Sequence, residues 1–237
     1  MAYEGTGSRS GNRTFSEILK QRRSRHEVLA GGLATAASAF SQAAWRSQRA
    51  SLPVLLSGPR IVGNAPNGDV YCTLTNNSGR TTADAANPLA PNEDGHIIRW
   101  RDTDRHVGTS FTWDIYLVAE DTHGTEQSFS DPDGLWADPD GRLFIQTDGG
   151  QQDGLNNQML VADPATGDLR RLFTGVTDCE ITGIAVTPNR RTMFVNVQHP
   201  GNGDPTLTNF PALPDGLSVP RDATVVISRK GGGVIGS

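Results

Sequence analysis

The stretch DGLWADPDGRLFIQTDGG (Asp133–Gly150) determines the expected fold. A short apolar run reaches a turn at Pro139 and a second apolar run follows at once, which is typical of a β-hairpin. The same unit occurs twice more, as RIVGNAPNGDVYCTLTNN (Arg60–Asn77) and TGIAVTPNRRTMFVNVQH (Thr182–His199), each with a proline at the corresponding turn. We therefore expect residues 57–237 to contain one structural unit repeated about three times.

Further strand-like runs follow each hairpin. Two follow the first hairpin, two follow the second and one follows the third: Gly95–Arg101, Thr112–Ala119, Asn157–Pro164, Leu169–Val176 and Ala223–Lys230. A set of four short antiparallel strands that recurs about every 50–70 residues is typical of the blades of a β-propeller. A β-sandwich is the alternative, because its strands look alike locally, but the repeated hairpin favours the propeller.

The predicted fold class is therefore all-β, a partial β-propeller of about three four-stranded blades after an N-terminal helical or signal segment. Closed propellers typically have about 4–8 blades. Three blades alone would leave open sheet edges, so we expect self-association that completes the propeller, derivation from a longer protein, or poor stability.

The composition limits the classes of function. The chain has 237 residues and a formal net charge of −5. It has no clustered basic stripe, which argues against a nucleic-acid partner. No run of about 18 apolar residues is present, so no membrane span is expected. The two cysteines, Cys72 and Cys179, could pair, but they are too few for a disulfide framework.

Residues 1–50 differ from the rest of the chain. In QRRSRHEVLAGGLATAASAF (Gln21–Phe40) a basic region precedes a weakly apolar stretch, which is the layout of an export signal. The stretch is similar to twin-arginine signals, although His26 stands where the second arginine of the pair is expected. We therefore predict a periplasmic or secreted protein, or a cytoplasmic one if the signal does not function. A basic amphipathic helix that begins with the capping box Thr14–Glu17 is the alternative.

Polar residues gather at one end of the predicted blades. In a blade the first strand starts at the mouth of the central channel and the second strand returns to it, so the residues that open the first strand and close the second meet there. Those residues are Arg60 with Asn76 and Asn77, Asp131 and Asp133 with Asp148, and Cys179 and Glu180 with Gln198 and His199. By contrast, Asp138 and Asp140 occupy the tight turn at the opposite end, where we expect a structural role.

These mouth residues predict a metal site. Carboxylate and amide oxygens suit Ca²⁺, and a histidine beside carboxylates suits iron or zinc. The candidate ligands are Asn76, Asp131, Asp133, Asp148, Glu180 and His199. A solvated polar rim is the alternative.

Several motifs carry a family resemblance: SEILKQRRSRHEVLAGGLA (Ser16–Ala34), YCTLTNNS (Tyr71–Ser78), NNQMLVADPATGDLRRLFTG (Asn156–Gly175), CEITGIAVTPNRRTMFVNVQHPG (Cys179–Gly201) and VVISRKGGGVIGS (Val225–Ser237). The first resembles the export signal, and the others the carboxy-terminal part, of the PhoX family of alkaline phosphatases. The resemblance implies an exported enzyme with a propeller fold that acts on phosphomonoesters, with Ca²⁺ and Fe³⁺ at the channel mouth. It indicates Glu180 most directly as a metal ligand.

The sequence also departs from the family pattern. Members of the family are longer, and the stretch that holds their iron-binding motif has no match between the signal and Ser57–Pro66. The first hairpin usually opens with Pro-Glu, whereas Pro59-Arg60 stands here. The middle of the family sequence is therefore expected to be missing and the iron site to be incomplete. The alternatives to an active phosphatase are a non-catalytic truncated propeller and a lactonase-type propeller that uses a single Ca²⁺.

Overall fold

The computed structural model describes residues 62–212 and 219–237. The predicted export segment, residues 1–50, and the candidate mouth residue Arg60 lie outside this part of the chain. None of the helices in the described residues is long and apolar enough to cross a membrane.

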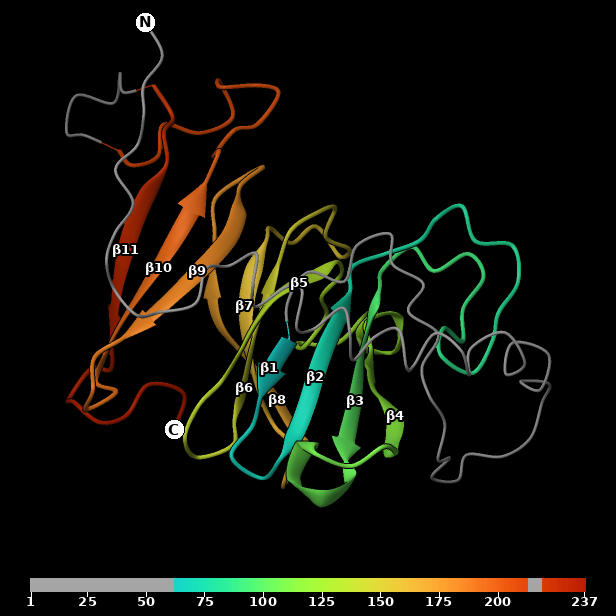
Figure 1. The fold of residues 1–237 in the computed structure, drawn as a ribbon. Helices are drawn as coiled ribbons and strands as arrows, with labels where there is room; N and C mark the ends of the chain where they lie inside the picture. The colour runs from blue at the N-terminus through green and yellow to red at the C-terminus, as the bar shows by residue number, and fades with distance from the viewer. Residues whose placement is uncertain (1–61, 213–218) are drawn as a thin grey trace, which may run out of the picture. The chain divides into compact units, whose positions relative to one another are not determined.

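The described residues form an all-β fold of three antiparallel sheets (Figure 1). Sheet 1 contains β1 (Val62–Asn64), β2 (Asp69–Leu74), β3 (His96–Asp102) and β4 (Phe111–Val118). Sheet 2 contains β5 (Pro132–Ala137), β6 (Leu143–Thr147), β7 (Gln158–Asp163) and β8 (Asp168–Thr174). Sheet 3 contains β9 (Glu180–Val186), β10 (Thr192–Gln198) and β11 (Ala223–Ser228). Two short 3₁₀ helices, η1 (Thr103–His106) and η2 (Glu120–Thr122), flank β4.

Each sheet is a meander in which consecutive strands are neighbours, and the runs predicted as strands are strands. The expectation of four strands in each sheet is wrong for sheet 3, which has three strands in the described residues. The reason lies in the residues after β11. Gly231, Gly232 and Gly233 have φ values of 84°, 82° and 113°, and this left-handed backbone turns the chain away from an extended path.

The inner strands of sheet 2, β6 and β7, are buried on both of their faces. Successive residues of a strand point to opposite faces, so Leu143 and Ile145 of β6 lie in a core shared with Tyr71 and Ile97 of sheet 1. Phe144, between them in sequence, lies in a second core on the other face. This arrangement explains why β6 begins with the continuous apolar run Leu143–Ile145 and lacks the polar alternation of a strand with one solvated face.

The second core joins sheet 2 to sheet 3. Met159 and Val161 of β7 pack there with Met193 and Val195 of β10, and Ile235 from the C-terminal tail completes it. The opposite face of sheet 3 is open: Phe194 and Val226, which are paired across β10 and β11, are 38% and 62% exposed.

Ion pairs connect sheets 2 and 3 at the turns where the prolines lie. The Asp138 carboxylate is buried and accepts hydrogen bonds from the backbone N–H groups of Asp140 and Arg142 and from Arg142 Nε at 2.8 Å. Arg190, in the β9–β10 turn, reaches across to Asp140 with an N–O distance of 2.6 Å. Asp138 and Asp140 thus have the structural role predicted for them.

Candidate metal centre

Three side chains from two sheets form a candidate metal cluster: Asp148, Glu180 and His199. Asp148 follows β6, Glu180 opens β9 and His199 follows β10. One potential ligand atom from each residue lies within 4.8 Å of those of the other two. The strand directions of adjacent hairpins therefore bring these three residues to one end of sheets 2 and 3.

His199 is held in an uncommon backbone conformation beside Glu180. Its φ is 37°, and its backbone N–H donates to Asp222 Oδ1 at 2.7 Å. Its Nε2 atom lies 3.3 Å from Glu180 Oε2. Its Nδ1 atom is buried and has no hydrogen-bond partner among the described residues. A buried nitrogen that lacks such a partner fits a role as a metal ligand better than a purely structural one.

The electrostatics of the cluster favour a bound cation. Glu180 is buried, and this burial, together with the negative charges of Asp148 and Asp133, raises its pKa. A hydrogen bond from Thr182 and the proximity of His199 offset part of the increase. Carboxylates that destabilise each other's ionised forms gain most from a positive ion placed between them.

Asp131 lies beside the cluster and is also buried. Burial, with the negative charges of Asp94 and Asp148, raises its pKa to about 6, and a hydrogen bond from Asn76 limits the increase. That bond joins Asn76 Nδ2 to Asp131 Oδ1 over 2.6 Å and so links the loop after β2 to sheet 2. Asn76 and Asp131 therefore lie together, but neither belongs to the three-residue cluster.

The chain packs closely around Asp131. Its φ is 52°, and its backbone carbonyl accepts a hydrogen bond from the N–H of Asp148 at 3.1 Å. A Cβ atom at Gly149 would lie 2.5 Å from Asp131 Cγ, so a glycine is required there. The glycine that follows Asp148 thus makes room for the neighbouring carboxylate.

Asp133 connects the cluster to sheet 1. Its backbone carbonyl accepts a hydrogen bond from Thr73 Oγ1 at 2.8 Å, and its carboxylate is close enough to raise the pKa of Glu180. The six predicted ligands therefore fall into a cluster of three, Asp133 next to it, and the bonded pair Asn76 and Asp131. Their role as metal ligands stays a prediction.

Sequence reasoning missed Asp94, which lies in the loop before β3. Its Oδ1 atom accepts hydrogen bonds from Ser130 Oγ at 2.8 Å and Gln152 Nε2 at 3.2 Å, and its carbonyl accepts one from the N–H of Asp131. Asp94-Gly95 has the sequence of an ordinary turn. The sequence therefore provides no indication that Asp94 lies beside Asp131.

The two cysteines are both free, so the disulfide considered from the sequence does not form. Cys179 is buried, and burial raises the pKa of its thiol to about 11. The thiol at the residue before Glu180 therefore stays protonated near neutral pH, and a thiolate ligand is not available there without a metal ion to displace the proton.

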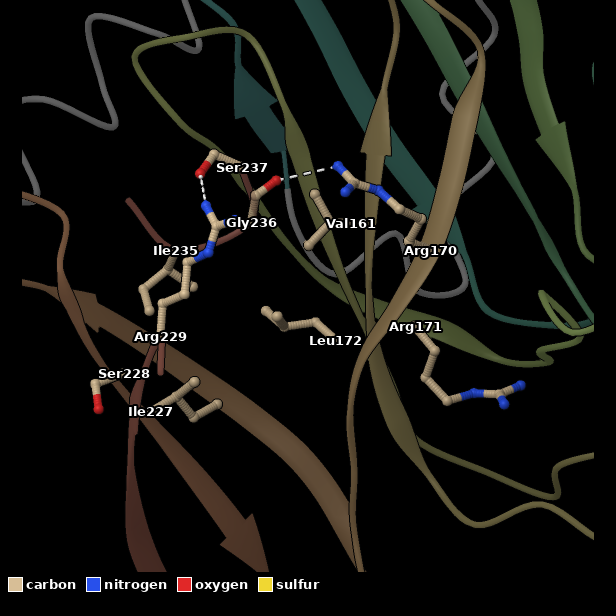
Figure 2. Close-up of a pocket in the computed structure, with 10 residues that line it drawn as sticks. All are labelled: Val161, Arg170, Arg171, Leu172, Ile227, Ser228, Arg229, Ile235, Gly236 and Ser237. Atoms are coloured by element: carbon tan, nitrogen blue, oxygen red, sulfur yellow. Dashed lines mark hydrogen bonds between the residues drawn. The ribbon is translucent and has the colours of Figure 1, made fainter. Parts of the chain in front are cut away.

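A cavity of about 320 Å³ lies away from the cluster, between β8, β11 and the C-terminal tail. Figure 2 shows Arg170 bonded to the Gly236 carbonyl and Arg229 bonded to the Ser237 hydroxyl at its rim. Val161, Leu172 and Ile235 supply apolar walls. No acidic or histidine side chain lines it, so its chemistry does not suit a metal ion.

The donor set of the cluster fits the metals that the sequence suggests. Two carboxylates and an imidazole suit iron or zinc, whereas the additional oxygens of Asp131, Asp133 and Asn76 suit Ca²⁺. The residues present are therefore compatible with either kind of ion.

Comparisons with known proteins point to one family. Residues 59–201 match the family model described as alkaline phosphatase PhoX. The solved structure of Pseudomonas fluorescens PhoX in complex with vanadate, a transition state analogue, is 40% identical and has a TM-score of 0.66. The match covers 75% of this chain and 34% of that one, so the chain spans about a third of the solved relative. A search of curated proteins gave no match.

Proposed function

The chain belongs to the alkaline phosphatase PhoX family, and from this we propose that it hydrolyses phosphomonoesters with metal ions held by Asp148, Glu180 and His199. The observation that carries the proposal is the convergence of these three side chains within 4.8 Å. All three lie inside the matched range, residues 59–201.

We further propose that the three sheets are blades of an incomplete β-propeller. Each sheet is a meander, and sheet 2 packs between sheets 1 and 3 through two apolar cores. The likeness to the solved PhoX structure supports this arrangement. Self-association would then supply the missing neighbours of the outer blades.

The acidic residues supply most of the site's chemistry. When bound, Ca²⁺ or Fe³⁺ would neutralise the charge of a phosphoryl group and polarise its oxygens. Asp148 and Glu180 provide the negative charge that attracts such an ion, and His199 provides a nitrogen donor. The hydrogen bond from Asn76 orients the Asp131 carboxylate at the edge of the cluster.

Location and activity are separate proposals. The basic and weakly apolar segment Gln21–Phe40 supports export to the periplasm or beyond. Because the chain spans about a third of the solved relative, a non-catalytic metal-binding product is the second candidate.

The proposed activity is tested by hydrolysis of p-nitrophenyl phosphate with Ca²⁺ and iron supplied. We expect turnover that EDTA abolishes and that Glu180→Gln lowers by at least about 100-fold, because grouped catalytic residues act as a unit. The control is Asp140→Asn at the opposite end of the hairpin, which should keep its activity. A folded, metal-loaded protein that shows no turnover would support the non-catalytic candidate.

A further inference from the structure

Asn157 lies immediately before β7 and is buried. Its Oδ1 atom accepts hydrogen bonds from Thr147 Oγ1 at 2.7 Å and Gln151 Nε2 at 3.0 Å. Its Nδ2 atom donates to the carbonyl oxygens of Gly149 at 3.0 Å and Cys179 at 2.6 Å. The amide therefore uses both of its donors and both acceptor positions of its oxygen.

The partners of this amide flank the carboxylates of the metal cluster. Thr147 and Gly149 are the residues on either side of Asp148, and Cys179 directly precedes Glu180. Asn157 thus bonds to the segment that carries one carboxylate and to the segment that carries the other. Those segments belong to sheet 2 and sheet 3 respectively, so one side chain connects the two sheets at the cluster.

We propose that Asn157 is a positioning residue that sets the separation of the Asp148 and Glu180 carboxylates and so determines the metal affinity of the cluster. The inference rests on the proposed metal site, and it adds a residue that contacts neither metal nor substrate. Its physical basis is rigidity. A saturated, buried amide allows little relative movement of the backbones that it joins, and a metal ion binds best to ligands that are held at fixed positions.

Gln146 provides a matched control. It is also a buried amide of sheet 2, and its Nε2 atom donates to the Gly183 carbonyl of sheet 3 at 3.1 Å. That carbonyl belongs to the body of β9, whereas Asn157 bonds beside Glu180, at its beginning. The two side chains therefore make the same kind of connection between sheets, and only Asn157 makes it at the cluster.

The test is the affinity of the full chain for Mn²⁺, measured from the electron paramagnetic resonance signal of the free ion. Mn²⁺ accepts carboxylate and imidazole ligands and so reports on the cluster directly. We expect Asn157→Ala to weaken binding by about 10-fold or more, the usual effect of losing a residue that orients metal ligands. Gln146→Ala should change the affinity less than about twofold, although both variants lower the melting temperature through a lost buried hydrogen bond.

Unchanged Mn²⁺ affinity in Asn157→Ala, or an equal loss in both variants, would overturn the inference. Thr147→Val serves if Asn157→Ala fails to fold. It removes the bond from Thr147 Oγ1 to the amide at nearly constant volume, together with the acceptor of the Gln158 N–H, and should weaken binding in the same direction by a smaller factor.

The two proposals fail in distinguishable ways. Mn²⁺ binding without phosphatase turnover would contradict the proposed activity and leave the positioning role to be decided by the variants. An unaltered chain that binds no Mn²⁺ would overturn the positioning role together with the metal site.

Discussion

At the scale of single residues, Asp131 carries an electrostatic cost that a metal ion would relieve. Its carboxyl has a pKa of about 6, chiefly because it is buried. A carboxyl whose pKa is higher in the folded protein than in the unfolded chain favours folding when it is protonated. Its contribution therefore becomes less favourable as the pH rises from about 4 to about 6, and the full cost is present above about pH 6.

Replacing Asp131 with asparagine should remove that cost in metal-free protein. The new side chain keeps an oxygen that can accept the hydrogen bond from Asn76. The quantity to compare is the free energy of unfolding of Asp131→Asn minus that of the unaltered chain. We expect this difference to be larger at pH 8 than at pH 4 by about 1–2 kcal/mol, after allowance for solvent screening.

The measurement is urea denaturation in EDTA across that pH range. A difference between the two proteins that stays constant with pH would contradict the electrostatic explanation. Addition of Ca²⁺ to the unaltered chain should reduce the pH dependence, because the cation compensates the carboxylate charge.

Sequence reasoning found the residues of the cluster and missed those that hold it. Asp148, Glu180 and His199 occupy corresponding ends of repeated hairpins, and the repeat alone indicates that they lie near one another. Asn157 could not be found in this way, because it acts through a hydrogen bond to a residue 22 positions away. Its importance depends on how sheet 2 meets sheet 3, and a strand pattern does not contain that information.

At the scale of structural elements, the turn of the β5–β6 hairpin contains a network of four ion pairs that differ in burial. Arg142 makes the close pair with Asp138, which is 1% exposed, whereas Arg190 makes its close pair with half-exposed Asp140 and lies 3.7 Å from Asp138. Removing one partner of a buried pair leaves an uncompensated charge, whereas an exposed pair is weakened by solvent.

We therefore expect Arg142→Ala to lower the free energy of unfolding by about 3–5 kcal/mol. Arg190→Ala should lower it by only about 1 kcal/mol or less, although Arg190 connects two sheets. Urea denaturation at neutral pH compares the two variants. Equal losses would show that the connection between the sheets matters more than the burial of Asp138.

The strands were predictable because prolines mark the same turn in each hairpin and apolar residues recur between the turns. Sheet 3 has three strands in the described residues, as the single strand-like run after the third hairpin indicates, although the fold class was predicted as four-stranded blades. The glycine run at Gly231–Gly233 was a further signal of this, since left-handed backbone does not continue a strand. The pairing of Arg190 with Asp140 was not predictable, because a repeat defines hairpins but not which turns face each other.

At the scale of the whole molecule, the open face of sheet 3 is the feature that favours association. Phe194 and Val226 lie on it side by side and are exposed. By contrast, sheets 1 and 2 cover each other's apolar faces in the first core. In the proposed propeller three blades would not close the ring, and a second copy of the chain is the partner that we propose for this face.

We expect sedimentation velocity of the unaltered chain to show a mass that increases with concentration, because association covers this apolar face. Phe194→Lys should shift the protein towards the monomer. The control is Leu207→Lys, which changes an exposed apolar residue outside sheet 3. A monomer at every concentration would show that this face does not mediate self-association.

The burial of β6 and β7 on both faces also affects how the fold opens. We expect these two strands to exchange their amide hydrogens with solvent only after at least one of the two cores has separated, whereas sheet 3 contributes only one face to a core. The centre of sheet 2 is therefore expected to be the most protected part of the described residues. The carboxylate of Asp148 extends from this slowest-opening sheet, and Glu180 extends from a sheet that can loosen first. Entry and loss of a metal ion would then follow fluctuations of sheet 3, with sheet 2 as the fixed side of the site.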